Sequence, residues 1–321
     1  MYKTIIRRVM ILIPQLLAIT MFVFLLSSFM PGDALQGRED PTLNMEMLEA
    51  QRERLGLNDP WYTQYGRWLR GILRGDFGMS ISNQNAVLPL IGQRLTNTFW
   101  LALLTIILIY IIAIPLGLFA GRYNDKVADR AIGMYTYFAM ALPTVVFAIV
   151  LLLIFGFRLQ WFPIRGSVTL DAHAAGGIQY IISRLHHMAL PATTGALLGT
   201  IAIIQYLRGE VIAFKSSDYV MTAKSKGTPE RKLYSRHILR NALIPVAANA
   251  GLAIVGLFTG AIFVETIFSY PGMGRLFIDS ITTRDFTVIN AIILLSSFLI
   301  AVGVLISDIL LATLDPRIRI K

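Results

Sequence analysis

Six long stretches without a charged residue constrain the fold of this chain more than any other feature. About 20 helical residues cross the ~30 Å hydrocarbon core of a membrane, and each stretch is at least that long. Inside lipid, backbone polar groups must find their hydrogen bonds within the protein, which favours helices. The sequence therefore predicts an all-α, polytopic membrane protein with six transmembrane helices, at 9–29, 98–121, 131–157, 188–207, 241–264 and 286–307.

The composition agrees with this class, because 55% of the residues are apolar and only 15% are charged, more apolar than a soluble domain. The first stretch follows Lys3, Arg7 and Arg8, as in a secretory signal, but it is too long for one and no small-x-small cleavage site follows. We therefore expect a retained helix. The chain has no cysteine, which excludes disulfides, thiolate metal sites and a cysteine nucleophile.

Lysine and arginine predict the orientation. With the N-terminus inside, the inner segments hold 17 of the 29 basic residues, and the short outer segments hold five. The remaining basic residues lie in 31–97, which is too long to count, since long segments cross the membrane regardless of charge. Both termini are therefore predicted to be cytoplasmic. The whole net charge of +10 falls on the inner side, so it is a topology signal and not a nucleic-acid footprint.

The same topology predicts four parts of the chain. A cytoplasmic N-terminus and first helix (1–30) precede an extracytoplasmic lid domain (31–97), a transmembrane core (98–313) and a cytoplasmic tail (314–321). The lid shows two amphipathic helical patterns, Asn44–Leu55 and Trp61–Leu73. Its turn residues are Pro60, Gly75 and Gly78. Proline and glycine also lie deep in several of the six stretches, where small residues let helices approach closely.

The polar, basic stretch Ser216–Pro245, here called the elbow, lies between two apolar stretches. Ser217 or Asp218 can cap a helix over Tyr219–Lys226, and Gly227 tolerates a left-handed stop. A second helix is predicted to follow, with Thr228 as its cap, Pro229 at its first position and Glu230 in its first turn. A loop that only fixes topology would not need two capped helices. We therefore predict a docking element for another protein.

A second motif follows the fifth stretch, between Glu265 and Gly274. Its Pro271-Gly272 pair predicts a type II turn. Glu265 near the membrane interface is consistent with a salt-bridge anchor and equally with a residue lining the outer mouth of a path through the membrane.

The elbow resembles the conserved cytoplasmic loop of ATP-binding-cassette (ABC) importer permeases, through Thr222, Ala223, Gly227 and the Ile244-Pro245 ending. The Glu of the family's Glu-Ala-Ala is replaced by Met221, a variant that is similar to the peptide-importer branch. The branch's other motifs recur in LGLNDP and GDFGMS of the lid, in the Glu265–Gly274 motif, and in Asp308 with the Leu314-Asp315-Pro316-Arg317 tail.

This resemblance implies a type I ABC importer permease fold in the cytoplasmic membrane of a prokaryote. It also implies a homologous second permease subunit, two cytoplasmic ATPases, and an extracytoplasmic binding protein that delivers di- or oligopeptides, or in other relatives nickel, glycosides or opines. The ATPase-coupling residues would be Tyr219, Thr222, Ala223, Lys224, Lys226 and Gly227. The outer mouth of the path would include Glu265, Pro271, Gly272 and Gly274.

Other functions have little support in the sequence. No Gly-x-x-x-x-Gly-Lys-Ser/Thr loop is present, so we expect no ATP binding by this chain, no catalytic residue and no cofactor. His173, His186 and His187 are interpreted as exposed loop residues and not as metal ligands. An ion-driven secondary transporter would need ionisable groups in mid-membrane, whereas Glu265 and Asp308 lie only at the ends of stretches. A membrane-anchored enzyme would need a nucleophile or a metal site, and no such constellation is found.

Overall fold

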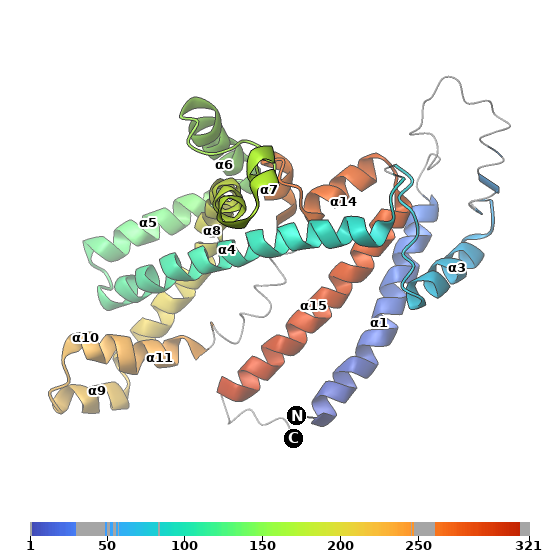
Figure 1. Ribbon diagram of the computed structural model, residues 1–321. Coiled ribbons are helices and arrows are strands. Elements are labelled where there is room, and N and C mark those ends of the chain that lie inside the picture. Colours follow the sequence, from blue (N-terminus) through green and yellow to red (C-terminus); the bar gives the residue numbers. More distant parts are fainter. Residues whose placement is uncertain are drawn as a thin grey trace. The chain divides into compact units, whose positions relative to one another are not determined.

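The computed structural model is helical (Figure 1). It describes residues 2–29, 49, 52–53, 56, 58–82, 84–244, 246 and 261–314. Within these ranges, the β-structure is one isolated bridge between Met79 and Ala86. Most of the predicted helix Asn44–Leu55, most of the fifth stretch, Pro245 and the tail after Leu314 lie outside the described residues.

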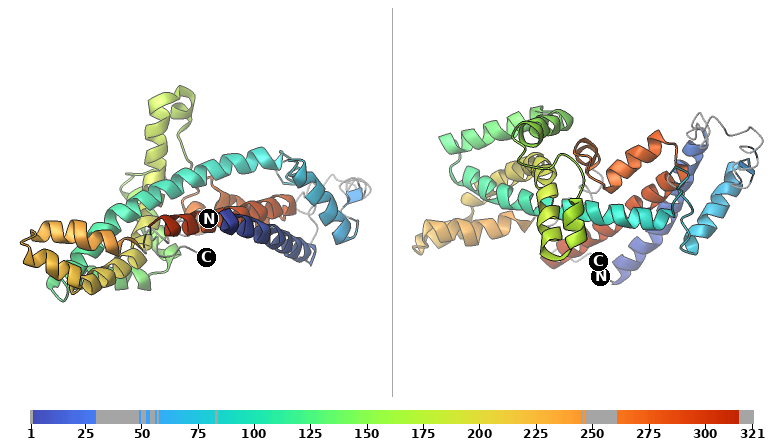
Figure 2. Two further views of the ribbon diagram at one scale, coloured as in Figure 1. Left: turned by 90° about the horizontal axis from the view of Figure 1, so that it is seen from below. Right: turned by 45° about the horizontal axis from the view of Figure 1, so that its top comes forward.

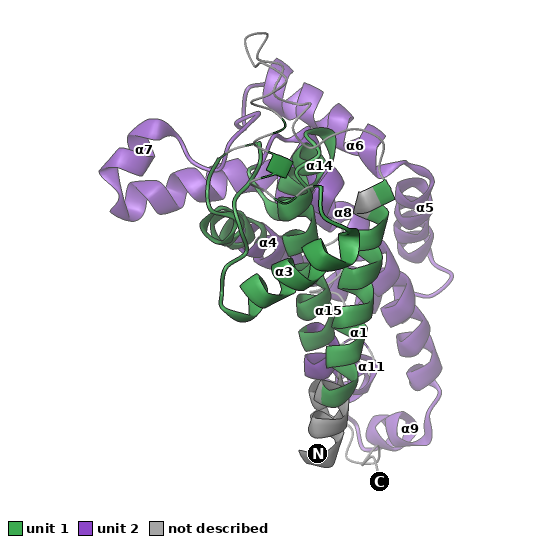
Figure 3. Ribbon diagram, turned by 90° about the vertical axis from the view of Figure 1, so that its right-hand side faces the viewer, with its two compact units in different colours: residues 1–98, 271–302 green, residues 99–270, 303–321 purple. Residues whose placement is uncertain are grey.

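The chain divides into two compact units (Figure 3). Unit 1 comprises residues 1–98 and 271–302, and unit 2 comprises residues 99–270 and 303–321. Two long helices, α4 (Val87–Arg122) and α15 (Phe286–Leu314), contribute residues to both units.

Unit 1 has its core where the start of α4 meets α14 (Met273–Thr282) and the start of α15. Val87 and Ile91 pack there with Leu276, Val288 and other buried side chains. Asp285, directly before α15, is fully buried. Its carboxylate accepts hydrogen bonds from the hydroxyls of Ser80 (2.5 Å) and Ser82 (3.0 Å), which fastens the Met79–Ala86 turn to the start of α15.

The lid helix α3 begins and ends where the sequence predicts, at Trp61 and Leu73. It packs on α1 (Tyr2–Phe29), where the hydroxyls of Tyr65 and Thr20 lie 3.1 Å apart and Phe24 meets the Tyr65 ring edge-on. Gly75 ends the helix with φ +79°, and Gly78 in the next turn has φ +81°. Both predicted turn glycines are therefore confirmed.

In unit 2, α4 packs closely on α8 (Gly177–Lys215), which is longer at both ends than the predicted stretch 188–207. Glycines allow the contact. A Cβ on Gly121 would lie 2.6 Å from the Val211 side chain, and one on Gly199 would lie 2.5 Å from Ile109. Similar contacts join Gly117 to Leu207 and Gly195 to Thr105. Because residue numbers rise together along the paired positions, α4 and α8 run parallel.

The sequence analysis predicted one transmembrane helix for the third apolar stretch, but the structure shows a bent pair of helices. It forms α5 (Val127–Ala141) and α6 (Thr144–Leu151), and the latter continues as the π-helix η1 (Leu152–Arg158). The two halves are bent by 104°. Leu142, which precedes Pro143, is extended (φ −85°, ψ 125°), because the proline ring disfavours a helical conformation for the residue before it.

The two halves nevertheless follow α8 along its length. The start of α5 contacts Arg208, whereas the segment after η1 reaches the other end of α8, where His186 Nε2 lies 2.8 Å from the Trp161 carbonyl oxygen. A short helix, α7 (Leu170–Ala175), precedes α8 (Figure 2). The three histidines were predicted to be exposed loop residues. All three are helical, and His187 is also buried, whereas His173 and His186 are exposed as predicted.

Among the described residues, α4, α8 and α15 are long and apolar enough to cross a membrane, and the bent pair makes a fourth candidate if it counts as one span. In α1, the apolar part runs from Met10 to Leu26. Residues 261–267, at the end of the fifth stretch, are helical.

Candidate functional site: the elbow and its anchorage

The elbow folds as a helical hairpin. Helix α9 (Asp218–Ser225) is followed by a second helix that comprises α10 (Glu230–Lys232), the π-helix η2 (Leu233–Ile238) and α11 (Leu239–Ala242). The two lie side by side and are in contact (Figures 1 and 2). The predicted helix–glycine–helix arrangement is therefore present.

Gly227 ends α9 as predicted, with φ +74°. The N–H of Thr228 donates to the Ala223 carbonyl (3.2 Å), and the N–H of Gly227 donates to the Lys224 carbonyl (3.0 Å). These two hydrogen bonds form a Schellman motif, which satisfies the last carbonyls of the helix when the residue after the cap is left-handed.

The predicted N-caps are wrong in detail. Ser217 occupies the position before α9, but its hydroxyl donates to the Phe214 carbonyl (2.6 Å) and does not cap the helix. The second helix starts at Glu230, and Pro229 stands before it with ψ 142°, so neither Thr228 nor Pro229 has its predicted place. Serine hydroxyls often bond to a backbone carbonyl three or four residues earlier, and here that carbonyl belongs to Phe214 in the preceding helix α8.

The inner side of α9 is apolar. Val220 is buried and Ala223 is half-buried, in a cluster with Leu207 and Val211 of α8 and with Leu233 and Ile238 of η2. The predicted coupling residues Tyr219, Thr222, Lys224, Lys226 and Gly227 are exposed. Ala223 differs from them, because its side chain packs on this chain's own core.

Met221 is an exposed coupling candidate that the sequence analysis did not include. Its side chain is 58% exposed. Together with Tyr219, it places apolar surface on a short helix that otherwise presents hydroxyls and lysines.

Arg122, the last residue of α4, anchors the second elbow helix. Its guanidinium donates to the Glu230 carboxylate (3.0 Å) and lies 5.2 Å from the centre of the Tyr234 ring. Lys215 at the end of α8 donates to the Arg122 carbonyl (3.2 Å). Tyr234 is buried, and burial raises the pKa of its hydroxyl, which therefore stays neutral.

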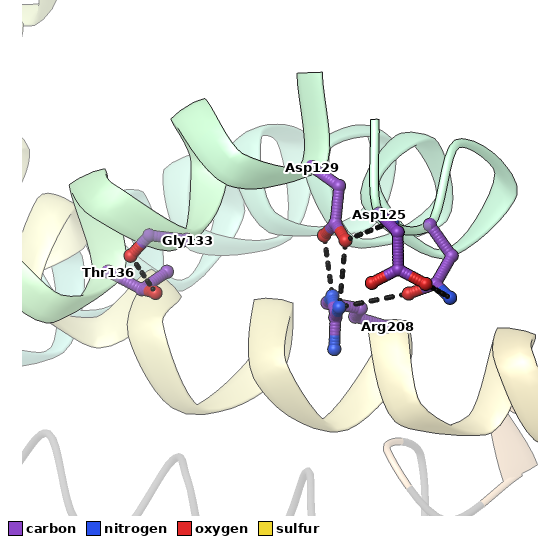
Figure 4. Close-up of polar contacts among 6 residues, drawn as sticks. Asp125, Asp129, Gly133, Thr136 and Arg208 are labelled. Atoms are coloured by element: carbon purple, nitrogen blue, oxygen red, sulfur yellow. Dashed lines mark hydrogen bonds and ion pairs between the residues drawn. The ribbon is translucent and has the colours of Figure 1, made fainter. Parts of the chain in front are cut away.

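A second anchor joins the start of α5 to α8, seven residues before Lys215 (Figure 4). Asp129, in the first turn of α5, is buried and accepts two hydrogen bonds from Arg208 of α8, at 2.6 Å from Nε and 2.8 Å from Nη2. The Arg208 guanidinium also donates to Asn124 Oδ1 (3.0 Å), and the backbone N–H of Asp125 donates to the Asp129 carboxylate (2.8 Å). Bidentate Arg–carboxylate contacts of this kind are strong and directional.

The sequence analysis missed Arg122, Asp129 and Arg208 as partners. Arg122 and Arg208 were counted only as topology charges. Their position directly after an uncharged stretch was the available signal, since a charge at a helix end can reach the loops that surround it.

The motif after the fifth stretch differs from its prediction. Gly272 precedes α14 in an extended conformation (φ −105°, ψ −173°), so the type II turn, which needs a positive φ at this glycine, is wrong. The positive φ falls at Ser269 (+46°). The Pro271 carbonyl accepts a hydrogen bond from Asn97 (2.9 Å), and Gly274 is buried.

Glu265 is fully buried, and its carbonyl accepts the N–H of Tyr270 (2.8 Å). Tyr270 is also fully buried, which raises its pKa to about 12. The role of Glu265, Pro271, Gly272 and Gly274 at an outer mouth stays a prediction. In the described part of the chain, no three His, Cys, Asp or Glu side chains are grouped as a metal site would require.

Two family models match the chain. Residues 113–320 match the "Binding-protein-dependent transport system inner membrane component" family, and residues 1–102 match the N-terminal region of such membrane components. The chain therefore belongs to the permeases of binding-protein-dependent ABC transporters. It is a multi-pass component of the bacterial inner membrane and not itself catalytic.

Three relatives place the chain within this family. It is 38% identical over 316 residues to the oligopeptide transport system permease protein AppB of Bacillus subtilis, with 98% of both chains covered. It is 31% identical over 315 residues to the probable peptide ABC transporter permease protein y4tP of Sinorhizobium fredii, again with 98% coverage of each. The glutathione transport system permease protein GsiC of Escherichia coli is 30% identical over the full length of both chains. The resemblance to the peptide-importer branch is confirmed.

Proposed function

We propose that this chain pairs with a homologous permease subunit to form a path for di- or oligopeptides, delivered by an extracytoplasmic binding protein and driven by two cytoplasmic ATPases. The observation that carries the proposal is the match of nearly the whole chain to an oligopeptide transport permease at 38% identity.

The proposed topology has six spans, both termini in the cytoplasm, and a lid at 31–97. The parallel course of α4 and α8 supports it, because helices that run the same way need one return crossing between them. The bent α5–α6 pair supplies that crossing. The pair follows α8 from Arg208 to Leu190, and the segment directly after η1 reaches His186. From Arg208 to His186 the helical rise is about 33 Å at ~1.5 Å per residue, which exceeds the ~30 Å core.

The elbow is the proposed seat of an ATPase subunit. Helix α9 presents Tyr219, Met221, Thr222, Lys224 and Lys226 outward, while Val220 and Ala223 hold it to the rest of unit 2. When the ATPases close, the elbows of the two permease subunits approach, and the attached helices carry that movement toward the outer side.

Peptides are the proposed cargo, because the relatives AppB and y4tP are named for oligopeptide and peptide transport and GsiC for transport of the tripeptide glutathione. Nickel, glycosides and opines are the alternatives within the wider family. An ion-driven secondary transporter is the alternative from a different class.

The test compares a strain that lacks this chain with the same strain carrying it on a plasmid. Uptake of a labelled dipeptide, glutathione, a labelled pentapeptide and radioactive nickel is measured in both. We expect chain-dependent uptake of at least one peptide, which stops when ATP is depleted and continues when a protonophore collapses the proton gradient. Uptake of nickel alone would refute the peptide assignment, and uptake that stops with the protonophore while ATP stays high would refute the ABC mechanism.

A further inference from the structure

The ion pair between Asp129 and Arg208 lies where three helices of unit 2 come together. Glycines 117 and 121 hold the last turns of α4 against α8. Arg208 lies on this same stretch of α8, and its guanidinium reaches both α5, through Asp129, and the α4–α5 turn, through Asn124. The elbow begins at Ser216, about two helical turns farther on.

The chemistry of the pair favours a fixed geometry over simple charge neutralisation. Asp129 is only 5% exposed and uses both carboxylate oxygens, each at a short distance from Arg208. A buried ion pair adds little net stability over apolar packing, but a bidentate guanidinium–carboxylate contact restricts the relative orientation of the two helices.

Without this pair, the described contacts that tie α5 to α8 would be less directional. The hydroxyl of Tyr135 donates to the Leu197 carbonyl (2.7 Å), but it meets α8 about three turns from Arg208, near the middle of the helix. At the elbow end of α5, Figure 4 shows Asp129 and Arg208 directed toward each other from the two helices. Among the described contacts, the pair is therefore the bidentate link between this end of α5 and α8.

We propose that Asp129 and Arg208 are positioning residues that lock the first turn of α5 to α8, so that a displacement of the elbow moves α4, α5 and α8 as one body. The transport part of this inference rests on the proposed function, since it needs an ATPase to move the elbow. The mechanical part concerns this chain alone.

The absence of cysteine in this chain gives a direct test, because introduced cysteines are the only sites on it that a thiol-reactive spin label can modify. The partner subunits of the complex are used in cysteine-free form. The labels are placed at Met134→Cys on α5, which is 73% exposed, and at Ser235→Cys on the second elbow helix, which is also exposed. The distance distribution between them is measured by pulsed electron paramagnetic resonance on the permease complex in lipid, with and without a non-hydrolysable ATP analogue.

With the native pair, we expect one narrow distribution in both conditions. Asp129→Asn keeps the size of the side chain and removes its charge, so the distribution should broaden. Substrate taken up per ATP hydrolysed should fall roughly two- to thirty-fold, the range of coupling changes seen for residues that touch neither ligand. Arg208→Lys, which keeps the charge but loses the bidentate geometry, should lie between the native protein and Asp129→Asn.

Asp125→Asn is the matched control. It makes the same chemical change four residues earlier, and the Asp125 carboxylate accepts from Asn124 and not from Arg208. Asparagine also tolerates the positive φ of +64° at this position. We expect a narrow distribution and native coupling.

A purely structural pair would give a different result. Asp129→Asn would then lower the amount or the melting temperature of the complex but leave a narrow distribution and native uptake per ATP, and this outcome overturns the inference. If Asp129→Asn does not accumulate, Arg208→Lys decides, because a broadened distribution with lower uptake per ATP supports the lock, whereas a narrow distribution with native uptake per ATP refutes it. A complex with a narrow native distribution but no peptide uptake would count against the proposed function and not against the lock.

Discussion

Gly227 offers a sharp test of the elbow, because a side chain added there would strain the backbone but would not collide with any neighbouring atom. Its φ is +74°, and a Cβ added to it would meet no atom within 4 Å. Any effect of a substitution therefore comes from the left-handed conformation that closes α9. The test series is Gly227→Asn, Gly227→Ala and Gly227→Val.

A residue with a Cβ costs about 1–2 kcal/mol in the left-handed helical region, which corresponds to a roughly five- to thirty-fold smaller population of the closed Schellman turn. Asparagine tolerates this region best and the β-branched valine worst. We therefore expect progressive loss in the order Asn, Ala, Val. The transmembrane packing should be unaffected, because the buried Val220 and the cluster around it do not include Gly227.

The assay measures, for each variant, the amount of permease in the membrane, the ATPase subunits that co-purify with it, and peptide uptake. The permease amount should stay constant, while ATPase retention and uptake fall together along the series. Gly209→Ala is the control, since Gly209 lies within α8, has no positive φ and also has open space around it. Alanine there should be neutral or slightly stabilising, because it favours helix more than glycine does. If Gly227→Val retained native ATPase binding and uptake, the elbow would not be the docking element.

Three further results are expected. A reporter that is active only outside the cytoplasm should work when fused after Asn85 or His173 and be silent after Ala128, Lys226 or Lys321, and activity after Lys226 would contradict the topology. The purified chain without its partners should hydrolyse ATP no faster than background, since it has no phosphate-binding loop, and hydrolysis by a partner-free preparation would disprove the assignment. Gly121→Val should destabilise unit 2 by about 1–3 kcal/mol through overpacking, because its Cβ would lie 2.6 Å from Val211. Gly92→Val is the control, since Gly92 has open space around it. In thermal unfolding of the purified protein, the control should lose less stability than Gly121→Val.

The sequence was sufficient for elements that depend on local chemistry. The bounds of α3 follow from Pro60, an aromatic stripe and Gly75, all within a few residues of the helix. The end of α9 follows from Gly227 in the same way. In both cases one glycine with a positive φ decides where the helix stops.

The bend in the third stretch was beyond sequence reasoning. Pro143 lies at the break, but Pro115 and Pro191 lie inside continuous helices. A proline removes one hydrogen bond in each case, and only the surrounding packing decides whether the helix bends or continues. The apolar sequence of such a stretch therefore does not show whether its helix runs straight or bends at the proline.

The anchors of the elbow were missed for a different reason. Asp129 and Arg208 are far apart in sequence, and each is unremarkable at the end of an apolar stretch. Their pairing depends on the way α5 returns along α8, which no local pattern encodes. Likewise, the turn at Pro271-Gly272 has favourable residues for type II, but Gly272 instead lies directly before α14, a helix that packs in the core of unit 1.

The paired glycines of α4 and α8 have a mechanical consequence. The two helices touch at Gly195 and Gly199 of α8 and again at Gly117 and Gly121 of α4. Two helices joined at two places resist bending more than one helix alone, so they move as a rigid pair. Over the rise of about 33 Å from Arg208 to His186, a tilt of only about 5° displaces the far end by roughly 3 Å. A small tilt at the elbow end of the two helices therefore displaces their other end by several ångströms, and a flexible residue between the two ends would absorb that movement.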